Sequence, residues 1–437
     1  MKKLLYGASS LALIGSFAVG GGRSYAARPA AQAMIQVRLC TSTPFGVPAL
    51  AHLSHGIENG VRLAENQMRH IFKNHFMKLL APLTLDYAKS DGSGYSTDIA
   101  RQNALQCLSD RTVYGMVGTL NSGAALVEEP ILNKRGMLMI SPANTGIPLT
   151  SFRPYAGSGG RAAEEPASYS HRLPYVTYYR TVTTDALQGP AGARYMAHTL
   201  HAKRYFLMDD KQTYGAGLAA SFGKEAARLG MIRVGIGHID PSDSASIATS
   251  TDAVTDEIVS KNPDAVYCGC DSETAITLPK RLRGKGYTKP LMGGDALQNA
   301  AWLEAGGTRG AQNDFATSVG PAVNASAARF RSAYTRTFHT ALDSYDATSY
   351  DAAMITLRAM INDHMQGGMT HGSLDQRRFS VVKWVHFTNY YGATGHTTFD
   401  SNGDTTNHIL TYYRSVGMNW VAAGSVKISG PGYSPTG

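Results

Sequence analysis

Residues 114–140 read YGMVGTLNSGAALVEEPILNKRGMLMI, and this stretch decides the fold. Its two ends, Tyr114–Gly118 and Met137–Ile140, are short apolar runs of the length of a buried strand. Between them, Ser122 is a residue type that can cap the start of a helix. A strand, a helix and a second strand in this order form the repeating unit of a parallel sheet covered by helices.

The same alternation continues in both directions from this stretch. Toward the N-terminus, strands are predicted at 35–40 and 83–87, and helices at 57–71 and 99–108. A second series follows, with helices predicted at 189–200, 218–229 and 273–283 and strands at 205–208, 264–268 and 291–293. Two such series predict an α/β protein with two doubly wound, Rossmann-like lobes.

The loops that follow the strands are where function is expected, because doubly wound folds bind ligands outside the carboxyl ends of their strands. These are the loops after Gly118, Ile140, Cys270 and Gly293. Nearer the C-terminus, the spacing of apolar residues predicts a helix over 354–361 and strands at 381–387 and 408–413. Pro279 is expected to kink the helix at 273–283.

The N-terminus has the pattern of a secretory signal peptide. Lys2 and Lys3 precede an apolar run, and a small-residue stretch ends in Ala-Gln-Ala at residue 33. No other stretch reaches the ~20 apolar residues that a spanning helix needs. Residues 1–33 are therefore predicted to be removed, which leaves an exported chain.

Composition and charge argue against several functions. The chain has 437 residues, 43% hydrophobic and 17% charged, which is typical of more than one folded domain. Its 41 basic and 32 acidic residues give +9, but four of the basic residues and no acidic one lie in 1–33, which leaves +5. The remaining lysines and arginines are scattered, so nucleic-acid binding is not expected. No HExxH, GxxxxGK[ST] or Cys/His metal spacing occurs, and we expect no metal and no cofactor.

The four cysteines give a weaker signal. Cys268 and Cys270 lie two apart in an apolar run, and on a strand they would share one face. We predict that all four are free buried thiols. A Cys40–Cys107 bridge stays open as an alternative, because export permits disulfides.

Five motifs in register resemble the branched-chain amino-acid-binding (Leu/Ile/Val-binding-like) type of periplasmic binding protein. They are residues 118–124 (GTLNSGA), 139–145 (MISPANT), 185–189 (DALQG), 210–217 (DKQTYGAG) and 292–295 (MGGD). Each motif alone is weak, but together they extend the resemblance over about residues 35–421.

The resemblance implies the type I periplasmic binding protein fold, with a ligand cleft between two lobes joined by three crossings near Arg180, Thr317 and Thr397. Lobe one would comprise 34–179 plus 318–397, and lobe two 180–317 plus 398–437. The implied function is a non-enzymatic periplasmic receptor that captures an amino acid or an amide-like small molecule. Its implied partner is an inner-membrane ABC permease, and the receptor would be a monomer.

The resemblance also implies a set of ligand-binding residues. A free amino acid presents a carboxylate and an ammonium group, and both must be paired when they are taken out of water. By the family's pattern, Ser122, the backbone at Ala143, and Thr145 would meet the carboxylate. Asp295 would accept from the ammonium group.

Other positions suggest how the ligand is selected. Tyr214 and Tyr345 match aromatic pocket walls, and Leu53 occupies a position that is often aromatic. Asp271 stands where the family carries an aromatic residue. Either it faces a ligand with more positive charge or more donors, or it caps the next helix. A slip of one residue in the match, which would put Cys270 or Ser272 at the site, stays open as an alternative. With Asn121 also polar, we expect a ligand more polar than leucine or valine.

Two other functions were considered. A ligand sensor built on the same lobes would usually carry a DNA-binding helix-turn-helix or a membrane anchor, and neither is visible. A hydrolase acting on a small nitrogen compound is the more distant alternative. Residues 156–160 (AGSGG) lack the strand and helix that must flank a nucleophile elbow.

Overall fold

The computed structural model describes residues 34–151, 175–318, 324–429 and 432–436. The predicted signal peptide and the segment 156–160 lie outside these ranges. Every helix within them is too short or too polar to cross a lipid bilayer.

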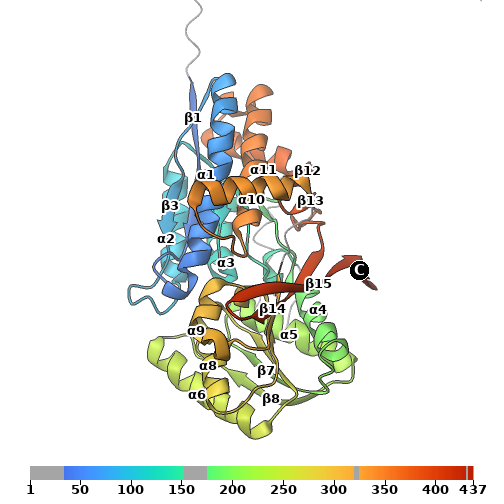
Figure 1. The fold of residues 1–437 in the computed structure, drawn as a ribbon. Helices are drawn as coiled ribbons and strands as arrows, with labels where there is room; N and C mark the ends of the chain where they lie inside the picture. Colours follow the sequence, from blue (N-terminus) through green and yellow to red (C-terminus); the bar gives the residue numbers. More distant parts are fainter. Residues whose placement is uncertain (1–33, 152–174, 319–323, 430–431, 437) are drawn as a thin grey trace, which may run out of the picture. The chain divides into compact units, whose positions relative to one another are not determined.

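The first sheet is built around β1 (Ile35–Thr43) and is parallel throughout (Figure 1). Its strands run in the order β2-β1-β4-β5-β6, and β3 pairs with β1 further along that strand. The other strands are β2 (Met77–Leu79), β3 (Leu83–Asp86), β4 (Val113–Gly118), β5 (Leu138–Ser141) and β6 (Tyr178–Arg180). Successive residues of β5 face opposite sides: Leu138 and Ile140 join one apolar core and Met139 joins another. Helices therefore cover both faces.

Six helices pack with the first sheet, and together they form what we call the first lobe. Three come from the N-terminal part, namely α1 (Ala51–Asn74), α2 (Thr97–Ser109) and α3 (Ser122–Asn133). Three come from much later in the chain, namely α10 (Ala325–Phe338), α11 (Asp346–Met365) and α12 (Leu374–His386). Helices α1 and α11 lie side by side despite their separation in sequence (Figure 1).

The predicted strand at 381–387 is wrong, because these residues belong to α12. Ser373 and Gln376 form a capping box that starts this helix. Its buried residues Arg378, Val381, Val382 and Val385 recur at helical spacing, so the valines fill one face of a helix. A cluster of valines occurs in buried strands and in buried helix faces, so it could not by itself distinguish a strand from a helix here.

The second sheet has eight strands in the order β16-β15-β14-β11-β10-β9-β7-β8. Strands β7 to β11 are parallel, and β14 to β16 extend the sheet in antiparallel fashion. Their bounds are β7 (Arg204–Asp209), β8 (Ile232–His238), β9 (Ala265–Gly269), β10 (Leu291–Gly293), β11 (Asp314–Ser318), β14 (Ile409–Val416), β15 (Asn419–Ser429) and β16 (Gly432–Thr436). The short hairpin β12 (Tyr390–Gly392) and β13 (Gly395–Thr397) stands apart from both sheets.

With its helices, the second sheet forms the second lobe. The helices of this lobe are α4 (Asp185–His198), α5 (Thr213–Arg228), α6 (Ser244–Lys261), α7 (Ser272–Ala275), α8 (Leu278–Gly284) and α9 (Ala300–Gly310). The single helix predicted at 273–283 is instead two, α7 and α8, and Pro279 lies in the first turn of α8. Proline is well placed there, because the first N–H groups of a helix have no partner within it.

The prediction of free thiols is wrong. Cys40 of β1 is bonded to Cys107 of α2, and Cys268 is bonded to Cys270 at the end of β9. The Cys40–Cys107 bridge lies in an apolar core where the strand and helix meet, a proximity that sequence spacing could not reveal.

The predicted fold class, an α/β chain with two doubly wound sheets, is confirmed. The helices of residues 325–386 pack with the first sheet, and β14 pairs with β11 in the second. The assignment of 34–179 plus 318–397 to one lobe and the rest to the other stays a prediction.

Candidate ligand-binding site

The loops at the carboxyl ends of strands from both sheets meet around one small cavity. It is lined by Leu50, Leu53, Leu120, Asn121, Ser122, Ala143, Tyr214, Asp271, Ser272, Asp295, Ala296 and Tyr345. Eight of the nine predicted site residues are in this set, and Thr145 is the exception. The space between these side chains is ≈ 10 Å³, enough for about one water molecule. An amino acid is larger than this space as the structure has it.

Ser122 is the first residue of α3, and its side chain does not cap that helix. Its hydroxyl oxygen instead accepts the N–H of Gly146 at 3.1 Å, which joins the start of α3 to the loop after β5. The hydroxyl proton is thus available to a ligand. The first N–H groups of a helix also lack partners within it, and they make its N-terminus favourable for an anion.

Ala143 is held differently from what the sequence predicts. The hydroxyl oxygen of Ser141 accepts the backbone N–H of Ala143 at 3.1 Å and that of Asn144 at 2.8 Å. The backbone at Ala143 can therefore offer a ligand its carbonyl oxygen. That group suits an ammonium donor and not a carboxylate.

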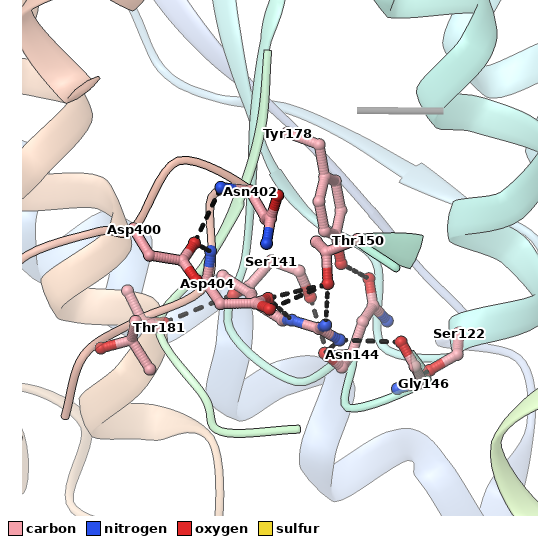
Figure 2. Close-up of polar contacts among 12 residues, drawn as sticks. Ser122, Ser141, Asn144, Gly146, Thr150, Tyr178, Thr181, Asp400, Asn402 and Asp404 are labelled. Atoms are coloured by element: carbon pink, nitrogen blue, oxygen red, sulfur yellow. Dashed lines mark hydrogen bonds and ion pairs between the residues drawn. The ribbon is translucent and has the colours of Figure 1, made fainter. Parts of the chain in front are cut away.

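Arg180 donates hydrogen bonds to the loop after β5, where Asn144, Gly146 and Thr150 are labelled in Figure 2. Its guanidinium is fully buried and donates to the carbonyl oxygens of Asn144 at 3.1 Å and Gly146 at 2.9 Å. It also donates to the Thr150 hydroxyl and forms an ion pair with Asp404 at 2.5 Å. One buried cation thus ties the loop that carries Ala143 to residues near position 404.

Thr145 is buried and is not among the residues that line the cavity. Its carbonyl oxygen accepts the N–H of Asp185, the first residue of α4, at 2.9 Å. Its hydroxyl lies beside the Asp185 carboxyl group, whose pKa is raised well above its usual range mainly by burial. Thr145 therefore joins the first lobe to the second, and in this structure it does not line the cavity.

Asp295 is the most completely hydrogen-bonded carboxylate in the cavity. Its Oδ1 accepts from Gln188 Nε2 at 2.5 Å and from the Tyr214 hydroxyl at 3.0 Å, and its Oδ2 accepts from the Tyr345 hydroxyl at 2.7 Å. Burial raises the pKa of Asp295, and these three donors oppose the rise because they stabilise the ionised form. The carboxylate is thereby positioned before a ligand arrives.

The glycine before Asp295 makes this arrangement possible. A Cβ atom at Gly294 would lie 2.3 Å from the Tyr214 hydroxyl and 2.7 Å from Gln188 Nε2. Any larger residue would push both donors away from the carboxylate.

Asp271 occupies the cap position of α7, but its side chain makes no capping hydrogen bond. The side chain lines the cavity with 6% of its surface exposed, and its Oδ2 has no hydrogen-bond partner. Burial raises the pKa of Asp271 well above its usual range, and the neighbouring carboxyl groups of Glu273 and Asp210 raise it further. Of the two predicted alternatives for Asp271, the capping role is the one that the geometry does not support.

Asn121 faces Asp271 from the first lobe. Its Oδ1 accepts from the Tyr87 hydroxyl at 3.1 Å, and that hydroxyl oxygen also accepts the backbone N–H groups of Leu120 and Asn121, both at 3.1 Å. Its Nδ2 is buried and has no hydrogen-bond partner. Tyr87 therefore orients the amide, and the Asn121 side chain lies near enough to the Asp271 carboxyl group to oppose the rise in its pKa.

Several residues of the site were not predicted. Gln188 belongs to the DALQG motif, yet nothing in the sequence indicates which way its side chain points. Ser272, which was predicted only as an alternative to Asp271, lines the cavity together with it. Tyr87 directly follows β3, whereas the sequence predicted it as the last residue of that strand and gave no signal for a role in the site. Arg180 was predicted only as a crossing point. Its pairing with Asp404, a residue more than 200 positions away in the sequence, could not be predicted.

Two doubly wound lobes that each contribute polar side chains to one enclosed cavity define a two-lobed solute-binding protein. The family model described as periplasmic binding protein matches residues 84–408. The chain belongs to this family, as a type I periplasmic binding protein of the Leu/Ile/Val-binding group of ABC-transporter substrate-binding proteins. These are non-enzymatic proteins, as the sequence predicted.

Curated relatives carry names from the same group. The chain is 26% identical over 193 residues to a Leu/Ile/Val-binding protein homolog of Brucella melitensis, covering 44% of this chain and 45% of that protein. It is 24% identical over 310 residues to the Leu/Ile/Val-binding protein BraC3 of Rhizobium johnstonii, covering 70% of this chain and 74% of that protein. The first match thus spans less than half of the relative's length, and the second about three quarters.

Solved structures share the fold at lower identity. A leucine-binding protein of Thermotoga maritima superimposes with a TM-score of 0.70 at 21% identity, covering 89% of this chain and 98% of that one. A solute-binding protein of R. palustris in complex with benzoate gives 0.70 at 15% identity, covering 89% and 96%. Proteins of one fold thus hold different small molecules.

Proposed function

We propose that this chain is the extracytoplasmic solute-binding receptor of an ABC transporter. Its ligand would be an amino acid or a polar, amide-like small molecule, captured as the two lobes close. The observation that carries the proposal is the distribution of polar groups around one cavity. Donors for an anion come from the first lobe, and an oriented carboxylate for a cation comes from the second.

The ligand's carboxylate would lie against the start of α3. There the Ser122 hydroxyl can donate, and the free N–H groups of the helix favour negative charge. The ligand's ammonium group would lie between the carbonyl oxygen of Ala143 and the carboxylate of Asp295. Leu50, Leu53 and Leu120 supply the apolar part of the wall. The names of the relatives support an amino acid as the ligand.

Closure would follow from contacts that cross between the lobes. Tyr345, at the start of α11, donates to Asp295 of the second lobe, and Lys89 Nζ donates to the carbonyl oxygens of Pro241 at 3.1 Å and Ser242 at 3.0 Å. A ligand that binds Ser122 and Asp295 together adds to these contacts only when the lobes meet. It therefore stabilises that form over a parted one.

The same proposal places the chain in the periplasm with an inner-membrane ABC permease as its partner. Residues 1–33 have the pattern of a signal peptide, and disulfides such as the two described persist in oxidising compartments. We propose that the mature receptor acts as a monomer.

Thermal melting of purified residues 34–437 tests the proposal. The panel would contain the common amino acids, small amides, polyamines and ureas. A ligand present at about one hundred times its Kd stabilises the folded state by ~2.7 kcal/mol, which raises Tm by a few degrees. A shift confined to one compound class is the expected result. An unchanged Tm with every compound would contradict the proposed function.

A further inference from the structure

The cavity contains two carboxylates, and its lining includes no lysine, arginine or histidine. Asp295 and Asp271 follow neighbouring strands of the second sheet, β10 and β9. A simple amino acid brings one carboxylate and one ammonium group. Its carboxylate is met by Ser122 and the start of α3, and its ammonium group balances one aspartate. The second aspartate would then have no partner of opposite charge in the cavity lining, and it could ionise only at a cost.

The hydrogen bonds of Asp295 suit it to a single ammonium group. A carboxylate has about four acceptor positions. Three of them are taken by Gln188, Tyr214 and Tyr345. One position remains, on Oδ2, and it is the one we assign to the α-ammonium group.

Asp271 is in the opposite condition. Its side chain is more than nine-tenths buried, it lines the cavity, and its Oδ2 has no partner. It does not cap α7, so no helix group satisfies it. Its backbone groups are engaged: the N–H donates to Asp210 Oδ2 at 2.7 Å, and the carbonyl oxygen accepts from the Thr274 hydroxyl at 2.8 Å. Beside it, the Nδ2 of Asn121 is also buried without a partner.

We propose that the ligand is an α-amino acid with a second cationic nitrogen on its side chain, and that Asp271 binds that nitrogen. This deepens the proposed function and rests on it, since it assumes that Ser122 and Asp295 hold the amino-acid backbone. The two aspartates then balance two ammonium groups. The amide of Asn121 can hydrogen-bond to a polar ligand side chain. The apolar side chain of a leucine-type ligand would offer it no acceptor.

Calorimetric titration with matched pairs of amino acids isolates the second nitrogen. In each pair the side-chain ammonium group of one compound is replaced by a methyl group in the other. The pairs are 2,3-diaminopropionate with 2-aminobutyrate, 2,4-diaminobutyrate with norvaline, and ornithine with norleucine. In at least one pair the diamino acid should bind more tightly, on the order of tenfold to a hundredfold, as expected for a charge-assisted hydrogen bond.

Two variants locate the preference. In Asp271→Asn the diamino acid should lose its advantage while the monoamino partner keeps its Kd or binds more tightly. In the matched control Glu273→Gln the preference should persist, because Glu273 is buried nearby but does not line the cavity. Loss of the preference in both variants would overturn the assignment to Asp271.

The outcomes separate this inference from the proposed function. If the monoamino acids bind as tightly as their diamino partners, the inference fails while the receptor function stands. If no amino acid of either kind binds, the proposed function fails as well. Should Asp271→Asn not fold, the wild-type pairs still decide between these results.

Discussion

At the residue scale, the proposed contact between Ser122 and the carboxylate of the ligand can be tested by a single substitution. The Ser122 hydroxyl is fixed by the N–H of Gly146 and retains its proton for a ligand. Replacement by alanine should raise the Kd of the bound amino acid on the order of tenfold to a hundredfold, because a hydrogen bond to a charged carboxylate is lost. Isothermal titration calorimetry measures this change directly.

A suitable control for this variant is Ser109→Ala at the exposed end of α2, where the hydroxyl donates only to the carbonyl oxygen of Gln106. Its Kd should match that of the wild type. If Ser122→Ala also binds with the wild-type Kd, the carboxylate does not lie at the start of α3.

The residues of the site show what could be predicted and what could not. Asp295, Tyr214 and Tyr345 were predicted separately, and they do converge, although their joint hydrogen-bond network was not anticipated. Motif position alone placed Thr145 in the cavity, but its carbonyl and hydroxyl groups face Asp185. For Asp271 the sequence left two alternatives, since a carboxylate at a helix start can cap or turn away. Only side-chain geometry distinguishes them.

At the scale of elements, the buried Arg180–Asp404 pair holds the loop after β5 in place. Asp404→Asn would leave a fully buried guanidinium without its counter-charge. Removing one partner of a buried pair costs about 3 kcal/mol or more, so the free energy of unfolding should fall by that amount. Urea denaturation of the purified variant measures it.

The matched control for Asp404→Asn is Asp252→Asn, which breaks a pair of the same residue types, Arg281–Asp252, at the surface. That change should cost no more than about 1 kcal/mol, because exposed pairs contribute little. Equal effects of the two substitutions would mean that the Arg180 network does not stabilise the loop.

The elements also explain where prediction from sequence succeeded. The βα units with short apolar strands, such as β4, β5 and β10, were predicted within a residue or two, because buried parallel strands are continuous apolar runs. The exposed strand β8 and the polar helix α10 gave no such signal and were not predicted. The Cys40–Cys107 bridge was only an alternative, because the proximity of β1 and α2 is a tertiary property, and the Cys268–Cys270 bridge was not predicted.

At the scale of the whole molecule, buried carboxyl groups predict how stability depends on pH. Burial raises the pKa of Glu65 and Asp346 to about 8 and that of Asp314 to about 7. The folded state therefore holds these protons more tightly than the unfolded chain, whose carboxyl groups titrate near pH 4. The free energy of unfolding should fall as pH rises from about 4 to about 8.

At acidic pH, carboxyl groups with lowered pKa values have the opposite effect on the free energy of unfolding. Hydrogen bonds from Arg228 and Arg194 lower the pKa of Glu225, so its ionised side chain stabilises the folded state. That stabilisation is lost as the pH falls below the usual pKa of a glutamate. Urea titrations at pH 5, 6, 7 and 8 should give steadily lower midpoints. A midpoint that rises over this interval would contradict the assignment of these carboxyl groups as protonated in the folded state.

The central claim is that one amino acid binds between Ser122 of the first lobe and Asp295 of the second. The most direct test is a calorimetric titration of residues 34–437 and of the double variant Ser122→Ala/Asp295→Ala with the amino acid that gives the largest thermal shift. We expect one ligand per wild-type chain and no measurable binding to the double variant. Binding of the same stoichiometry and Kd to both proteins would show that the ligand site lies elsewhere.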